Sequence, residues 1–120
     1  MMVLFLFIRL FTVISNIPLN VRWSRSGVTV AGGHGGGNTT DQLQYPYGLY
    51  LDNEQTIIIV DHENHRIVQW IINEANGQVV AGGNGRGNRL DQLNYPTDVL
   101  VDKETDNLII ADFHNRRIVR

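Results

Sequence analysis

The chain has 120 residues, of which 42% are hydrophobic, and its 10 basic and 12 acidic side chains give a net charge of −2. This length allows one small domain, the hydrophobic fraction supports a folded core, and the balanced charge excludes a dedicated DNA-binding protein. The absence of cysteine excludes disulfides, thiolate-bound zinc and thiol catalysis.

Residues 1–20 form a separate apolar segment at the N-terminus, interrupted by Arg9. Its apolar run is too short for a transmembrane helix, which needs about 20 apolar residues, so we expect no membrane span. The length fits a secretory signal peptide, although no basic residue precedes the run and no small-residue cleavage site follows it. Two interpretations stay open: a signal peptide of a secreted protein, or a truncated or mis-joined segment of a cytoplasmic one.

Residues 21–120 contain two copies of a repeat of about 50 residues, a period typical of solenoids and propellers. Three pairs of segments align in one register, with one residue inserted in the second copy: 30–38 with 80–88, 41–46 with 91–96, and 61–68 with 112–119. The copies differ in charge, because the second carries five arginines and the first carries one.

Short strands between turn residues are predicted throughout both copies. In chain order we expect strands at 28–31, 49–51, 56–60, 65–72 and 78–81, with Asn76–Gly77 forming a hairpin turn. The segment 28–31 mirrors 79–81 and therefore corresponds to the last strand of a preceding unit. No segment has the period of an amphipathic helix.

Four consecutive strands at this period predict an all-β fold built from propeller blades, each a four-stranded antiparallel meander. Blade 1 is expected at about 46–82 and blade 2 at about 96–120, where it lacks its last strand. Because one blade cannot bury both of its faces, stacking between blades must supply the core. The sequence therefore predicts an incomplete propeller of about two blades.

The motif after the β-branched strand resembles the NHL repeat, in which Asp is followed by Asn-His-Arg. The first copy supplies Asp61, Asn64, His65 and Arg66, and Tyr-Pro pairs at 45–46 and 95–96 also fit. The second copy has the same motif with Arg in place of His: Asp112, Asn115, Arg116 and Arg117. Because Arg66 and Arg117 occupy the same repeat position, we expect them to be structural arginines that bond backbone or carboxylate groups between strands.

Members of the NHL family usually close with about six blades, so the resemblance implies that the chain holds only part of a propeller. Two explanations stay open: a fragment, or a homo-oligomer in which the leading strand of one chain completes the open blade of the next. Three chains would then close a six-bladed ring.

Two chemical interpretations of the repeat are weaker than structural ones. The glycines at 33 and 35–37 resemble a phosphate-binding loop, but no helix follows to present its N-terminus. Asp61, His62 and His65 resemble metal ligands, but Phe113 and Arg116 replace the histidines in the second copy. We therefore expect a tight loop, exposed histidines, and no catalytic, cofactor or metal-binding residues.

Positions that differ between the copies are the candidates for partner binding, since repeated positions serve the scaffold. They are Tyr47, Arg86, Arg89, Arg116 and Arg120, whereas Tyr45 and Tyr95 repeat and are expected to pack. We expect a non-catalytic scaffold for a protein or other macromolecular partner. Two alternatives are RNA binding through an arginine-rich face and, by resemblance to related propellers, a metal-dependent lyase or lactonase.

Overall fold

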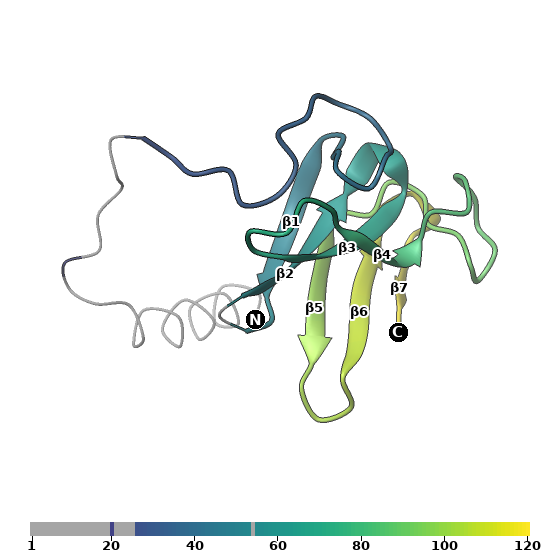
Figure 1. Cartoon of the computed structure of the whole chain (residues 1–120). Helices are drawn as coiled ribbons and strands as arrows, with labels where there is room; N and C mark the ends of the chain where they lie inside the picture. Colours follow the sequence, from purple (N-terminus) through teal and green to yellow (C-terminus); the bar gives the residue numbers. More distant parts are fainter. Residues whose placement is uncertain (1–19, 21–25, 54) are drawn as a thin grey trace.

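The structure is a computed structural model that describes residues 20, 26–53 and 55–120, and these form two antiparallel sheets (Figure 1). The first sheet has four strands in the order β1-β2-β3-β4: β1 (Pro46–Leu51), β2 (Thr56–Asp61), β3 (Arg66–Ile71) and β4 (Gln78–Gly82). The second has three in the order β5-β6-β7: β5 (Asp98–Asp102), β6 (Asn107–Asp112) and β7 (Arg117–Val119). The predicted all-β fold of incomplete propeller blades is confirmed.

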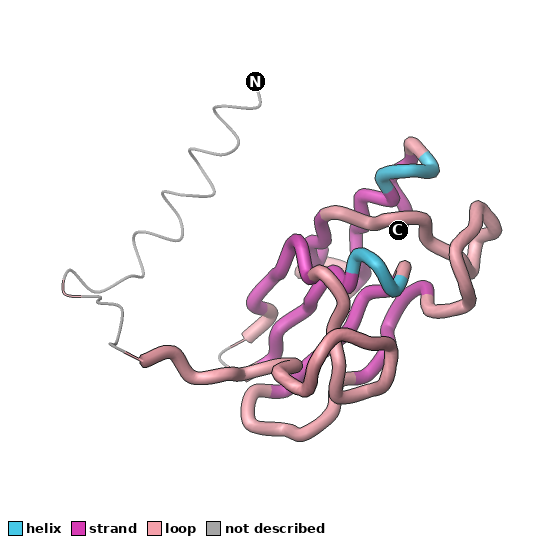
Figure 2. The backbone as a smooth tube through the Cα atoms, turned by 90° about the horizontal axis from the view of Figure 1, so that it is seen from above, coloured by secondary structure: helices cyan, strands magenta, loops and turns pink. Residues whose placement is uncertain are grey.

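A short 3-10 turn joins the second and third strands of each sheet. These turns are η1 (His62–Asn64) and η2 (Phe113–Asn115), and Figure 2 draws each in cyan between two magenta strands. Each turn ends at a residue with a left-handed backbone, His65 at φ 52° and Arg116 at φ 53°. The two copies therefore share one local backbone path, as their sequence register requires.

Residues 28–31 form no strand, so the predicted leading fourth strand is wrong. A strand needs a hydrogen-bonded neighbour, as β4 has in β3 of its own sheet. No third strand lies beside 28–31 among the residues that the structure describes. Val28 is instead 80% exposed, and Ala31 packs against the first sheet. The apolar segment 1–20, apart from Asn20, lies outside the described residues.

Asn76–Gly77 does not form a two-residue hairpin turn, which corrects a second prediction. The connection between β3 and β4 is longer, and Asn73 is its residue with positive φ, at 76°. Gly77 is required for another reason: a Cβ there would clash with the side chains of Val68 and Trp70. Its N–H also donates to the carbonyl of Thr40, 2.7 Å away, so the connection is tied to the preceding loop.

The glycine-rich loops take the tight path that the sequence predicts. Gly33 has φ 88° and its counterpart Gly83 has φ 80°, in the region that favours glycine over residues with a Cβ. The repeat of these angles explains why the glycines themselves repeat.

In the described part of the chain, no helix is long and apolar enough to cross a membrane.

The two sheets share a hydrophobic core that neither could form alone. Its buried members come from both copies: Ile58, Val60, Ile67, Leu93, Val99 and Ile110. The opposite face of the first sheet buries Ile59, Val68 and Trp70, with Ala31 and Leu43 of the preceding loop packed against them. Alternate residues of β2 thus serve two different interfaces, because successive side chains of a strand point to opposite faces. This is how adjacent blades stack.

Replacing Ile67 tests the core between the sheets. Ile67 is 0% exposed, and truncating such a side chain removes apolar contacts and leaves a cavity. We expect Ile67→Ala to lower the free energy of unfolding by about 2–5 kcal/mol. Urea unfolding measures this, with Leu90→Ala as the control because Leu90 is 91% exposed. Equal destabilisation by the two substitutions would contradict the shared core.

Candidate partner-binding surface

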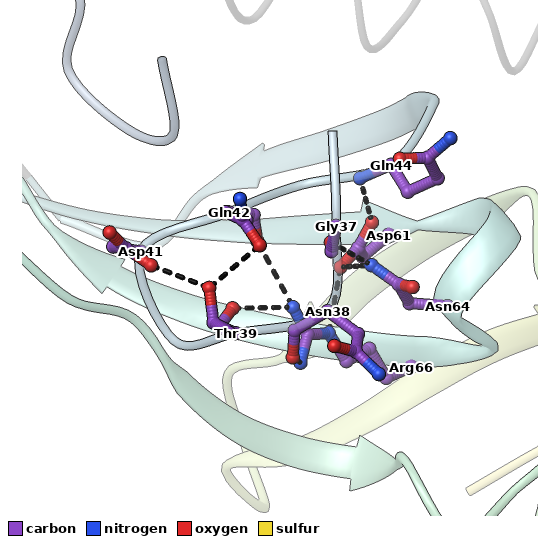
Figure 3. Close-up of polar contacts among 9 residues, drawn as sticks. All are labelled: Gly37, Asn38, Thr39, Asp41, Gln42, Gln44, Asp61, Asn64 and Arg66. Carbon is purple, nitrogen blue, oxygen red and sulfur yellow. Dashed lines mark hydrogen bonds and ion pairs between the residues drawn. The ribbon is translucent and has the colours of Figure 1, made fainter. Parts of the chain in front are cut away.

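A buried carboxylate organises the Asp-Asn-His-Arg motif of the first copy (Figure 3). Asp61 is 0% exposed and lies at the end of β2. Its Oδ1 accepts the backbone N–H of Gln44 at 2.7 Å, while Oδ2 accepts from Asn64 Nδ2 at 2.8 Å and Arg66 Nε at 2.7 Å. One side chain therefore joins β2, η1, β3 and the loop before β1.

The Arg66 guanidinium extends this network to the preceding loop. Nη1 donates to the carbonyl of Asn38 at 2.8 Å, and Nη2 donates to those of Thr39 at 3.1 Å and Gln42 at 3.0 Å. Asn64 Nδ2 adds a bond to the carbonyl of Gly37 at 2.7 Å. Because the charged groups and the loop carbonyls all find partners, the ion pair is satisfied despite its burial.

The second copy repeats the network atom for atom. Asp112 Oδ1 accepts from the backbone N–H of Asn94 at 2.7 Å, and Oδ2 accepts from Asn115 Nδ2 and Arg117 Nε, both at 2.8 Å. Arg117 in turn donates to three loop carbonyls, those of Asn88, Arg89 and Gln92. The structure thus places the motif residues of both copies in scaffold positions.

Blades of this kind, stacked face to face and tied to their loops by a buried Asp–Arg pair, define a repeat protein of the β-propeller class. The family model of the NHL repeat matches residues 43–70, so this segment, from the loop before β1 to Trp70 in β3, is an NHL repeat. The sequence resemblance to that family is confirmed. No curated protein matches the chain.

A row of aromatic and imidazole rings crosses from the first copy to the second at the end that carries η1 and η2. We call it the aromatic row, and its members are Tyr47, His62, His65, Tyr95, Phe113 and His114. Tyr47 stacks on His62 with ring centroids 3.8 Å apart and planes 7° apart. Tyr95 then lies within 4.5 to 5.0 Å of three imidazoles, those of His62, His65 and His114.

Two hydrogen bonds fix the row across the boundary between the copies. His62 Nδ1 donates to the carbonyl of Pro96 at 2.9 Å, and His65 Nδ1 accepts the backbone N–H of Tyr95 at 3.1 Å. The imidazoles of the first copy therefore hold the Tyr-Pro pair of the second. The expectation of exposed histidines is wrong for His62, which is 9% exposed, because Tyr47 covers its ring.

The tyrosines also differ from expectation. Tyr45 was expected to pack, but it is 65% exposed and has a left-handed backbone at φ 51°. Tyr47 is 59% exposed although one ring face lies on His62, which leaves it a candidate contact for a partner. Tyr95 is half-buried by the imidazoles around it. Equivalent sequence positions therefore have different surroundings in the two copies.

The four candidate arginines do not form one face. Arg86 lies over the ring of Tyr95, with its guanidinium carbon 6.0 Å from the ring centroid, and Arg116 directly follows η2 at the same end. Arg89 forms an exposed ion pair with Asp91. Arg120 lines a cleft between the two sheets, away from the row. Arg86 and Arg116 are therefore the two candidates that the fold brings near the aromatic row.

Sequence reasoning singled out Tyr47 and Arg86 but missed most of the row. His62 and His114 stand at neighbouring positions of the two turns rather than at equivalent ones, so the repeat alignment hides their proximity.

In the described residues, no three or more His, Cys, Asp and Glu side chains gather as metal ligands would.

Burial lowers the pKa of His65 below its ordinary value of 6.5, and the nearby Arg86 guanidinium lowers it further. The hydrogen bond acts in the same direction, because Nδ1 cannot accept the Tyr95 N–H once it is protonated. Unfolded His65 consequently binds a proton more readily than folded His65. Its contribution to the free energy of unfolding then falls as pH drops below about 6.5.

The buried ion pair gives a prediction on stability. Asp61→Asn leaves the Arg66 charge buried without a carboxylate, and we expect it to lower the free energy of unfolding by about 3–5 kcal/mol. Chemical denaturation measures the change. Asp91→Asn is the matched control, because Asp91 pairs with an arginine on the surface, and it should have a much smaller effect. Similar effects of the two substitutions would show that the buried pair does not organise the repeat.

The pKa of His65 gives a second prediction. Replacing it with Asn, which tolerates a left-handed backbone, should flatten the fall in stability as the pH drops below about 6.5. Urea unfolding at a series of pH values provides the measurement. His34→Asn is the control, since Asn84 occupies that position in the second copy and His34 is exposed. An unchanged pH profile in His65→Asn would argue against proton-linked unfolding at this residue.

Proposed function

We propose that this chain belongs to a non-catalytic β-propeller scaffold that binds a protein partner through the aromatic row. The NHL repeat indicates a propeller-type scaffold, and the row supplies a surface with the chemistry of a partner contact. The observation that carries the proposal is Tyr47, a large ring that remains 59% exposed while its position is fixed by stacking on a buried imidazole.

Three properties of Tyr47 support this role. Tyrosine is enriched in the regions of interfaces that contribute most to affinity. The ring is already held by His62, so the Tyr47 side chain loses little conformational entropy when a partner binds. The scaffold itself does not require it, because Thr97 occupies the same place in the second copy. A side chain that the fold does not need, fixed on the surface, is suited to contact a partner.

The test uses the residue of the other copy. Tyr47→Thr keeps a side chain that this repeat position tolerates and removes the ring. We expect the variant to keep its unfolding midpoint and to lose affinity for partners captured by the wild-type chain, by about tenfold or more. Quantitative affinity capture from the source cells, followed by titration of each captured protein, measures the loss.

Leu90→Thr is the control, since it removes a 91% exposed apolar side chain that is not part of the row. It should retain the partners that Tyr47→Thr loses. If both variants retain every partner with wild-type affinity, the aromatic row is not the binding surface.

RNA binding is a second candidate function, favoured by the guanidinium of Arg86 over the ring of Tyr95. Proteins that bind single-stranded nucleic acid combine cationic side chains with aromatic rings on which bases stack. Here the imidazoles of His62, His65 and His114 surround Tyr95 and restrict the ring surface that a base could use. This enclosure is the reason we favour a protein partner.

A further inference from the structure

The differences between the two copies add positive charge at the end that carries the aromatic row. Gly36 of the first copy becomes Arg86, Glu63 becomes His114, and His65 becomes Arg116. Each of these positions lies in η1, η2, their C-caps or the glycine-rich loop. Since the scaffold folds the same way with either residue, the fold does not explain these substitutions.

The main chain of Arg86 is held by backbone contacts, and its guanidinium pairs with no carboxylate of the described residues. Its main chain forms a β-bridge with Leu93, which is 3% exposed, and the next residue, Gly87, donates its N–H to the Leu93 carbonyl at 3.3 Å. The guanidinium lies over Tyr95, and Arg86 forms no ion pair with any carboxylate in the part of the chain that the structure describes. A guanidinium that lies over a ring and has no carboxylate partner among the described residues favours an anionic ligand.

Arg89, three residues along the same loop, shows the contrast. Its Nε and Nη2 contact the two carboxylate oxygens of Asp91 at 3.0 and 3.2 Å. That bidentate pair satisfies the guanidinium within the chain. Both arginines are exposed and lie in the same loop, but of these two only Arg86 has no carboxylate partner among the described residues.

The imidazoles beside Tyr95 supply further donors. His65 Nδ1 accepts the backbone N–H of Tyr95, so the neutral ring carries its proton on Nε2, where it can donate to an anion. The His114 ring lies 4.6 Å from the Tyr95 ring, and its imidazole nitrogens have no hydrogen bond to the described residues, whereas its backbone N–H donates to the Asn94 carbonyl. The acidic group with an electrostatic effect on His65 is Glu63, an exposed carboxylate on η1, the turn that His65 caps. Cationic and N–H groups therefore outnumber carboxylates around this ring.

We propose that Arg86, His65 and His114 form a carboxylate-binding site around Tyr95 that takes an acidic side chain of the protein partner. This site rests on the proposed function, because it specifies the chemistry of the partner that the aromatic row binds. Tyr47 provides the apolar contact at one end of the row, and the cationic group provides the charge contact around Tyr95, further along the row. The partner segment is thus acidic, with an apolar residue beside its carboxylates.

The test is a binding titration of the full chain with a fluorescein-labelled oligoglutamate peptide, followed by fluorescence anisotropy at low salt. We expect Arg86→Gln to weaken binding about tenfold and added salt to weaken wild-type binding. Arg86→Lys, which keeps the charge, should recover part of the affinity. Arg89→Gln is the matched control and should bind as the wild type does, because Asp91 already neutralises Arg89. Circular dichroism of each variant confirms that the fold is retained.

Three results would overturn the site: no binding of oligoglutamate, equal weakening by Arg86→Gln and Arg89→Gln, or tighter Arg86-dependent binding of an oligouridine strand than of the peptide. The last result would assign the site to RNA. Failure of the carboxylate site can be distinguished from failure of the proposed function. If Tyr47→Thr abolishes capture of a protein partner but Arg86→Gln leaves it intact, only the carboxylate site is rejected.

Discussion

The buried pair of Asp61 and Arg66 is the interaction on which the rest of the repeat depends. Neither group could be buried alone, because an unpaired charge in the interior is strongly destabilising. The pair is stable because Asp61 accepts three hydrogen bonds and Arg66 donates four, to the carboxylate and to three loop carbonyls. The loop before β1, the turn η1 and two strands are consequently fixed by one network, which recurs in the second copy.

The aromatic row follows from this constraint. The network sets the path of η1, whose C-cap His65 takes a left-handed backbone and directs its ring to Tyr95 of the next copy. His62, in the same turn, donates to the Pro96 carbonyl and supports the ring of Tyr47. The scaffold motif within one blade thus also joins that blade to the next, and the joint is where exposed rings gather.

The proposed binding function depends on positions at which the two copies differ. Arg86 replaces a glycine, and Tyr47 stands where the other copy has threonine. Neither side chain contributes to the buried network or to the core between the sheets. These residues lie at the same end of the blades because the turns and the glycine-rich loops meet there, so variation between copies changes the surface without changing the fold.

The sequence by itself determined the all-β class, the two copies, most strand positions and the structural role of the Asp–Arg motif. These follow from local rules: β-branched runs favour strands, and identical residues in one register adopt identical local structure. Only the tertiary structure decided that residues 28–31 form no strand, that Gly77 is required by Trp70, and that His62 is buried. It also brought together Tyr47, His62, Tyr95 and His114. The physical reason is that strand pairing, close packing and ring contacts depend on residues far apart along the chain. A repeat alignment compares equivalent positions and does not show which non-equivalent residues are neighbours in space.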